Sequence, residues 1–354
     1  MEGYPAKARS LAWLSTELTY VNVQVLYDQL GNISGFLREP EVEGSNPFGP
    51  TNFLLTCLEM EDIILSNGVK IPSIGLGTWQ LLGKECEYAV KNALELGYRH
   101  IDTAEIYNNE SDIGNAIRGF DRKKLFITSK VWPMHCNYDG VLNACNNSIK
   151  RLGCDYLDLY LIHWPKGVKD LEETFRAFKK LYDDGKVKSI GVSNFYIDEL
   201  KKSLEICDKL NLPLSVNQIE MHPYAYDKKI LDFCKENKIV VTSYSPLARG
   251  LVIRDKIIKN IAEKCNRTPS QVTLRWLLQK RTIVIPKASS EKHLYENLRI
   301  FDFKLSEEDI RKIDLIGRKN KLILFSLKMK HVLKHIIKMA RGGLIWDYIK
   351  TKIL

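Results

Sequence analysis

Short apolar runs rich in β-branched residues alternate with longer segments of helical period from Asp62 to about Gly317. An alternation of this kind is typical of repeated strand and helix units that build a parallel sheet. We predict eight such units in the chain. The predicted strands are Ser73–Leu76, Arg99–Thr103, Leu125–Lys130, Leu157–His163, Ile190–Ser193, Ser215–Glu220, Val240–Ser243 and Ile283–Pro286.

Helix boundaries and one hairpin can also be predicted from local signals. The segments Lys84–Leu96 and Leu171–Asp183 have helical period, and Thr268 followed by Pro269 is a favourable helix start. Ahead of the first strand, Asn67-Gly68 stands between two short apolar runs, which is a strong hairpin signal. We expect this hairpin to close the bottom of a barrel.

Eight parallel strands fit either a closed barrel or an open, doubly wound sheet, so periodicity alone leaves both open. An open sheet that binds a dinucleotide usually carries a complete glycine fingerprint for the phosphates, and the lack of one here favours the barrel. After Gly75 and Gly77 a dinucleotide fingerprint would need glycine at position 80, where Gln80 stands. The predicted fold class is therefore α/β, a (β/α)8 TIM barrel with an N-terminal β-hairpin.

The net charge of +10 is concentrated at one end of the chain. From Arg318 onward there are ten Lys or Arg residues and one Asp, a charge of +9, which leaves +1 for residues 1–317. The body of the chain therefore has no basic stripe that indicates nucleic acid as a partner. No metal site is expected, because the eight cysteines lack the close spacing of a zinc or dithiol motif. Reduced cysteines and the lack of a leader-like or membrane-spanning segment favour a cytoplasmic protein.

Four polar side chains stand at or just after the ends of predicted strands: Asp102, Tyr107, Lys130 and His163. The carboxyl ends of barrel strands share one mouth, so these side chains are expected to converge. Each has a structural alternative: Asp102 as a turn cap, Lys130 as a surface lysine, His163 as a core histidine, Tyr107 as a half-buried tyrosine. Their joint placement, not any single residue, indicates a catalytic site.

The chain resembles the aldo-keto reductase family in four motifs over roughly residues 60–317. Residues 97–114, GYRHIDTAEIYNNESDIG, are similar to the first family signature, and residues 187–195, VKSIGVSNF, to the second. Residues 127–132, ITSKVW, and 160–165, YLIHWP, resemble the family's lysine and histidine segments. The resemblance implies a barrel that reduces aldehydes or ketones with a nicotinamide cofactor, with Asp102, Tyr107, Lys130 and His163 as the catalytic tetrad.

In this interpretation Tyr107 is the general acid that protonates the carbonyl oxygen as hydride reaches the carbon. A free phenol is a weak acid at neutral pH, so we expect Lys130 to lower the pKa of Tyr107. Asp102 would hold Lys130 charged and oriented, while a neutral His163 would orient the carbonyl or help the proton transfer.

The resemblance also implies the cofactor contacts. Ser193, Asn194 and Gln218 match residues that bind the carboxamide, Tyr244 matches the residue that stacks on the ring, and Ser245 and Leu247 lie near the pyrophosphate. The predicted adenosine end comprises Lys287, Ser289, His293, Glu296 and Asn297.

This adenosine end departs from the family at two positions. Ala288 replaces the usual Ser, and His293 replaces the usual Arg. An Arg makes a permanent bidentate contact with phosphate, whereas His is mostly neutral at pH 7. We therefore expect NADPH as the cofactor and keep NADH as an alternative.

Substrate and assembly are less defined by the sequence. Trp79, Trp132 and Trp164 follow strand ends and are expected to line an apolar pocket for a small carbonyl substrate. The alternatives are a dedicated sugar or diketo-acid reductase, or a nicotinamide-binding regulatory module with slow turnover. We expect a monomer.

Three regions are predicted: an N-terminal extension outside the family at 1–59, the barrel at 60–317, and a basic amphipathic tail at 318–354. A mis-assigned start is one explanation for the extension, because residues 60–68 resemble a family beginning. For the tail we favour packing on the barrel or a frayed end over contact with an anionic membrane.

Overall fold

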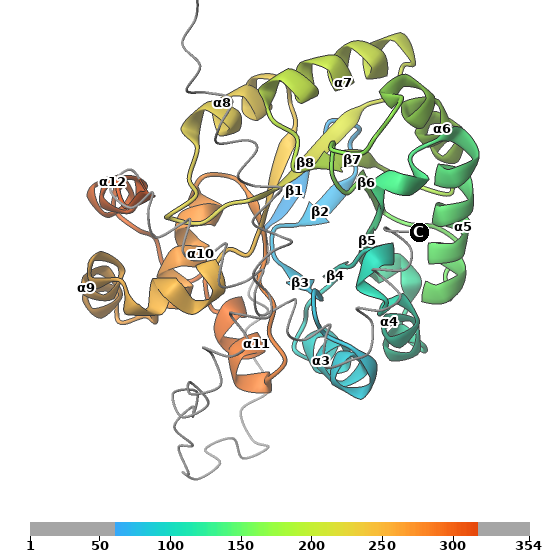
Figure 1. Cartoon of the computed structure of the whole chain (residues 1–354). Helices are drawn as coiled ribbons and strands as arrows, with labels where there is room; N and C mark the ends of the chain where they lie inside the picture. Colours follow the sequence, from blue (N-terminus) through green and yellow to red (C-terminus); the bar gives the residue numbers. More distant parts are fainter. Residues whose placement is uncertain (1–60, 318–354) are drawn as a thin grey trace, which may run out of the picture. The chain divides into compact units, whose positions relative to one another are not determined.

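Eight parallel strands form the central sheet, and each is followed by at least one helix on the outside of the sheet (Figure 1). The structure is a computed structural model that describes residues 61–317. In sequence the strands run β3 to β10, and neighbours in sequence are neighbours in the sheet. Their bounds are β3 Gly75–Gly77, β4 His100–Asp102, β5 Phe126–Val131, β6 Leu159–Ile162, β7 Ile190–Ser193, β8 Leu214–Glu220, β9 Val240–Tyr244 and β10 Ile283–Ile285.

The helices cover the outer face of this sheet in chain order (Figure 1). Their apolar stripes pack on the outward side chains of the strands and form the larger of two buried clusters. The α-helices are α3 Gly83–Glu95, α4 Glu110–Ile117, α5 Tyr138–Leu152, α6 Leu171–Asp183, α7 Ile197–Lys209, α8 Lys228–Glu236, α9 Lys256–Cys265, α10 Pro269–Gln279, α11 Glu291–Leu298 and α12 Glu307–Asp314. Short 3-10 turns are η1 Glu105–Tyr107, η2 Arg122–Lys124, η3 Pro133–His135 and η4 Ala248–Arg254.

The first and last strands meet and close the sheet into a barrel. Ile74 forms a parallel bridge with Val284, and the Gly77 N–H donates to the Pro286 carbonyl at 3.2 Å. A Cβ on Gly77 would lie 2.6 Å from the Ile285 carbonyl oxygen, so only glycine allows this approach. The predicted (β/α)8 barrel is confirmed.

The predicted hairpin lies at the bottom of the barrel. Strands β1 (Asp62–Ile64) and β2 (Lys70–Pro72) pair antiparallel. The Asn67 amide donates to the Lys188 carbonyl at 2.8 Å, which ties the turn to the barrel. Leu65 and Ile71 of the hairpin belong to the smaller buried cluster, which fills the barrel interior. Its other buried members are Phe126, Leu159, Leu161, Val216, Ile283 and Ile285.

Most predicted elements are found within one to three residues of their expected ends. Helix α6 has the predicted bounds, and Thr268 caps α10 together with Gln271, which confirms the predicted start. The largest differences, two residues each, are at the starts of β3 and β6, which are predicted at Ser73 and Leu157. Ile74 and Leu157 form only isolated bridges, with Val284 and Val187. The predictions for residues 1–59 and for the tail at 318–354 concern residues outside the described part of the chain.

One titratable group, His100, is buried in the lower part of the barrel. Its ring packs edge-on against Phe126 at 5.1 Å between centroids, and its Nε2 lies 3.1 Å from the Thr128 hydroxyl. Only 1% of His100 is exposed, and this burial lowers its pKa to about 4, against the opposing effect of Asp102. The neutral ring is therefore the folded form at neutral pH.

His100 should make the barrel acid-sensitive. Between pH 6.5 and 4 the unfolded chain binds a proton at this residue and the folded chain does not, so stability falls as pH falls. When the pH is lowered from 6.5 to 4, the free energy of unfolding should fall by about 3 kcal/mol less in His100→Gln than in wild type. Urea unfolding at several pH values measures it, with the half-exposed His135→Gln as the control. Parallel curves for His100→Gln and wild type would contradict the assignment.

Candidate functional site

Three strand ends converge on the amine of Lys130. Its Nζ, on β5, donates to Asp102 Oδ1 of β4 at 2.6 Å and to the Thr103 carbonyl at 2.8 Å. The second carboxylate oxygen of Asp102 accepts from the Gln218 amide of β8 at 2.7 Å. Lys130 and Asp102 are almost fully buried, and burial lowers the pKa of Lys130 while Asp102 acts in the opposite direction. The result is a buried ion pair whose members are both hydrogen-bonded.

Tyr107 lies directly above this ion pair. It ends the short turn η1 that follows β4, and Asn108 reverses the chain with a left-handed backbone (φ 55°). Lys130 Nζ donates to the Tyr107 hydroxyl oxygen at 3.4 Å. The tyrosine ring is in edge contact with Trp79 at 4.8 Å between centroids. Tyr107 is therefore fixed by a hydrogen bond at one end and by an aromatic wall along its ring.

His163 forms the opposite wall of the site. It follows β6, and its ring contacts Tyr107 at 5.6 Å and Trp132 at 5.3 Å between centroids, both edge-on. The residue is 7% exposed. Burial, with the charge of Lys130 as a second cause, lowers the pKa of His163 well below 6.5. The imidazole is neutral at physiological pH, as the sequence interpretation required.

The expected acidification of Tyr107 is wrong for this site. Burial of the hydroxyl and the negative charge of Asp102 raise the pKa of Tyr107 well above 10. The expectation counts only the ammonium of Lys130 as acting on the phenol, whereas Asp102, 2.6 Å from that ammonium, balances its charge. Tyr107 is therefore a protonated phenol at neutral pH, held by Lys130 rather than ionised by it.

Amide and hydroxyl groups line the next strand ends. Ser193 ends β7, and its hydroxyl donates to the backbone carbonyl of Gln218 at 2.9 Å. The Asn194 side-chain amide donates to the backbone carbonyl of His163 at 3.0 Å. Asn194 also accepts from the Tyr244 hydroxyl at 2.8 Å. Burial raises the pKa of Tyr244 well above its usual value, so its ring is uncharged. This set of donors and acceptors beside a flat neutral ring fits the carboxamide and ring of a nicotinamide.

The remaining residues expected at the cofactor lie on the elements that follow. Ser245 has a left-handed backbone (φ 48°) just after β9, and Leu247 caps η4. Lys287 and Ser289 lie between β10 and α11, while His293, Glu296 and Asn297 lie on α11. His293 is exposed near the start of this helix, and its backbone N–H donates to the Ser290 hydroxyl. These residues follow the ends of β9 and β10, the last two strands of the barrel.

The three tryptophans differ in their surroundings. Trp79 and Trp132 contact Tyr107 and His163 respectively, as described above. Trp164, which follows His163, is 40% exposed. The structure thus brings two of the three predicted pocket residues into contact with the tetrad.

Sequence reasoning gave no role to two buried polar residues beside the site, Asn109 and Glu110. Both follow Tyr107 within the motif that carried the family resemblance, and their exposures are 0% and 1%. The most distant partner of Asn109 is 31 residues away in the chain, and that of Glu110 is 41 residues away. Their position in the motif is the only local signal, because polar residues soon after Tyr107 could equally be solvent-exposed.

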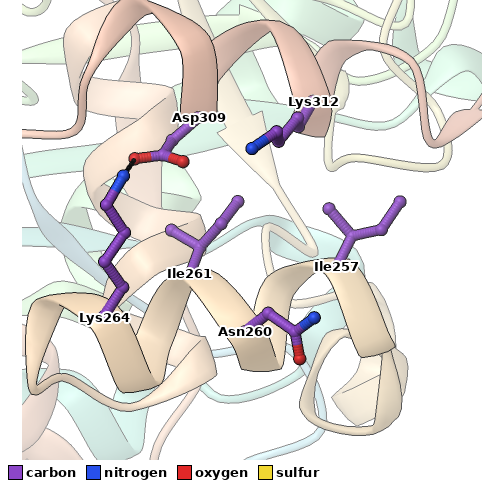
Figure 2. Close-up of a pocket in the computed structure, with 6 residues that line it drawn as sticks. All are labelled: Ile257, Asn260, Ile261, Lys264, Asp309 and Lys312. Carbon is purple, nitrogen blue, oxygen red and sulfur yellow. Dashed lines mark hydrogen bonds and ion pairs between the residues drawn. The ribbon is translucent and has the colours of Figure 1, made fainter.

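A hollow away from the strand ends lies between α9 and α12 (Figure 2). Its charged residues are already paired: Lys264 donates to Asp309 at 2.8 Å, and Lys312 pairs with Glu308 at 2.7 Å. It is lined by Ile257, Asn260, Ile261, Lys264, Asp309 and Lys312. These side chains offer no acid, base or nucleophile free for chemistry, so the candidate site stays at the strand ends.

Two further observations concern residues 61–317 only. No group of three or more His, Cys, Asp or Glu side chains in this range is arranged to hold a metal ion. Across the same range no helix combines the length and the apolar character needed to cross a membrane. The expectations of a monomer, a cytoplasmic location and no nucleic-acid partner stay predictions.

A (β/α)8 barrel with a phenol, an amine, a carboxylate and a neutral imidazole at its mouth defines a class of barrel oxidoreductases that act on carbonyl groups. The chain belongs to the aldo/keto reductase family, whose model matches residues 73–318. It is an NAD(P)H-dependent oxidoreductase that acts on small carbonyl substrates.

Its relatives agree with this assignment. The glyoxal reductase of Bacillus subtilis (strain 168) is 44% identical over 261 residues, which cover 73% of this chain and 93% of that protein. The crystal structure of an aldo/keto reductase from Brucella melitensis matches with a TM-score of 0.69 and 41% identity, over 73% of this chain and 99% of that one. The aldose reductase of Schistosoma japonicum matches with a TM-score of 0.67 and 39% identity, over 72% and 91% of the two chains.

Proposed function

We propose that this protein reduces aldehydes or ketones to alcohols with NADPH, and that Tyr107 is the general acid. The observation that carries the proposal is the hydrogen bond from Lys130 to the Tyr107 oxygen at 3.4 Å. An ammonium can only donate, so the phenol accepts this bond and keeps its own proton for another acceptor. A carbonyl oxygen between Tyr107 and His163 is the acceptor that we propose.

Each residue of the tetrad has a defined part in this reaction. NADPH, when bound, supplies the hydride. Tyr107 donates its hydroxyl proton to the oxygen that gains charge, and Lys130 then stabilises the phenolate that is left. Asp102 keeps Lys130 in place, and Gln218 completes the bonds of Asp102. Neutral His163 hydrogen-bonds the same carbonyl oxygen and directs it towards Tyr107.

We propose small aldehydes and ketones as substrates, with an apolar wall formed by Trp79 and Trp132 and an outer contact at Trp164. The names of the relatives, glyoxal reductase and aldose reductase, favour aldehydes within this class. NADPH oxidation against a panel of aldehydes, ketones, keto-sugars and diketo-acids tests the proposal. Absence of turnover with tight cofactor binding would favour the regulatory-module alternative.

Replacement of the proposed acid should separate chemistry from binding. Tyr107→Phe removes the only proton that the residue can donate and keeps the ring against Trp79, so turnover should fall about 10²- to 10⁴-fold. The dissociation constant for NADPH, measured by fluorescence titration, should stay close to that of wild type. Unchanged turnover in this variant would remove Tyr107 from the mechanism.

The pH profile should reflect a phenol whose pKa is raised. Reduction needs the protonated form of Tyr107, and a pKa well above 10 keeps that form present throughout the neutral and mildly alkaline range. His163 stays neutral down to well below pH 6.5. We therefore expect the turnover number for reduction to be flat from about pH 7 to about pH 9. A tenfold fall per pH unit inside that range would instead support a phenol acidified by Lys130.

NADPH is preferred over NADH in this proposal because Lys287 lies where the 2′-phosphate is expected. His293 on α11 is exposed and takes the place of the usual Arg, so it contributes a full charge only when protonated. The preference for NADPH is therefore expected to be weaker than an Arg would give.

Restoring the guanidinium should strengthen that preference. His293→Arg adds a permanent cation with a bidentate fork, so the dissociation constant for NADPH should fall about tenfold while that for NADH stays nearly unchanged. Fluorescence titration with both cofactors at pH 7.5 measures the two constants, and His293→Gln is the control without charge. An equal effect of His293→Arg on both cofactors would place the side chain away from the 2′-phosphate.

A further inference from the structure

The segment that carries Tyr107 is tied down by Asn109 on the side of β3. The Asn109 amide donates to the carbonyls of Thr78 and Leu81, both at 2.9 Å, and its oxygen accepts from the Thr103 hydroxyl at 2.7 Å. Thr78 and Leu81 lie on the loop that carries Trp79. One buried side chain therefore fixes the loop of the tryptophan and the loop of the tyrosine to each other.

Glu110, the next residue, ties the same segment to β5. Its Oε1 accepts from the Ser129 hydroxyl at 2.6 Å, and its Oε2 accepts from Arg151 Nε at 2.7 Å. The carboxylate is buried, whereas the Arg151 side chain is 39% exposed. Glu110 also stands in the first turn of α4, where a negative charge is favourable.

Gly114 lets α4 come close enough to α5 for this ion pair. It lies one turn after Glu110 on the same face of α4. A Cβ at this position would lie 2.6 Å from the Arg151 carbonyl oxygen and 2.9 Å from that of Leu152. The helix end that supplies Arg151 therefore packs directly on α4, which lies between α3 and α5 in the outer layer (Figure 1).

The segment from Tyr107 to Glu110 contacts two consecutive residues of β5, one at each of its ends. Tyr107 meets Lys130, and Glu110, three residues later, meets Ser129. Side chains of consecutive strand residues point to opposite faces, so the segment is attached to β5 from the barrel mouth and from the helix side. With both ends on the same strand, the tyrosine oxygen has little freedom to move relative to the lysine.

We propose that Glu110 is a positioning residue that holds the Tyr107 hydroxyl at Lys130 in the reactive geometry, with Asn109 as the second attachment of the same segment. The inference rests on the proposed function of Tyr107. A charge effect acts in the same direction, since Glu110 helps to keep Lys130 protonated. Both side chains are buried and bond to other protein groups, so the action assigned to them is through the position of Tyr107.

Glu110→Gln and Ser129→Ala test the attachment to β5. Glu110→Gln keeps the shape but loses the charge that pairs with Arg151, and Ser129→Ala removes the hydroxyl that donates to Glu110. Displacement of a reacting group by about 1 Å can cost about 100-fold, so we expect turnover to fall about 10- to 100-fold in both variants. The solvent deuterium isotope effect should rise, because proton transfer from Tyr107 becomes slower, while the NADPH dissociation constant changes less than about twofold.

The chain offers a matched control for each variant. Asp158, another buried carboxylate, pairs with Arg122 at 2.7 Å and accepts from the Ile127 N–H, so Asp158→Asn controls for Glu110→Gln. Ser203 is fully buried and its hydroxyl donates to the Glu199 backbone carbonyl at 2.8 Å within α7, so Ser203→Ala controls for Ser129→Ala. Turnover and isotope effect in both controls should stay within about threefold of wild type.

Three outcomes decide the proposal. A larger turnover loss and isotope effect in the test variants than in their controls would support it, and equal losses would overturn it. If circular dichroism shows that Glu110→Gln does not fold, the Ser129→Ala and Ser203→Ala pair decides. Tyr107→Phe, measured in parallel, keeps the two hypotheses apart: an active Tyr107→Phe contradicts the general acid, whereas an inactive one with equal test and control losses contradicts only the positioning role.

Discussion

The ion pair between Lys130 and Asp102 is the interaction on which the rest of the site depends. Two buried charges lose their hydration, at a cost of several kcal/mol each, and their attraction offsets this only when the remaining polar atoms are also satisfied. Here the Thr103 carbonyl and the Gln218 amide complete the set. Because these partners lie on or next to three different strands, the pair requires β4, β5 and β8 in their observed register. The closed barrel and the site therefore depend on each other.

The ion pair also determines the state of Tyr107. A lone ammonium beside a phenol lowers its pKa, but a pair that is neutral as a whole does not, and burial then dominates. Lys130 acts on the phenol through geometry, because its N–H donates to the tyrosine oxygen and leaves the phenolic proton for another acceptor. In the proposed reaction the ammonium also has an electrostatic part, since charge on the tyrosine oxygen would develop next to it during proton transfer.

The fold could be predicted from local patterns because the strands, the hairpin around Asn67-Gly68 and the cap at Thr268 each depend on neighbouring residues. The convergence of Asp102, Tyr107, Lys130 and His163 also followed from strand ends, since all strands of a barrel point the same way. Two features could not be predicted in this manner. The pKa of Tyr107 depends on burial and on Asp102 together, and the partners of Glu110 come from β5 and from the end of α5.

Strand β5 shows why residues outside the tetrad belong to the same problem. The period of two in a strand turns Lys130 towards the barrel mouth and Ser129 towards the helices, so the residues that bind Asp102 and Glu110 are consecutive in β5. Lys130 binds Asp102 on one side, and Ser129 binds Glu110 on the other. The loop from Tyr107 to Glu110 connects the two faces around the end of the strand. A shift of β5 along the sheet would displace both attachments at once, so the geometry of the acid is set by the register of one strand rather than by the tyrosine loop alone.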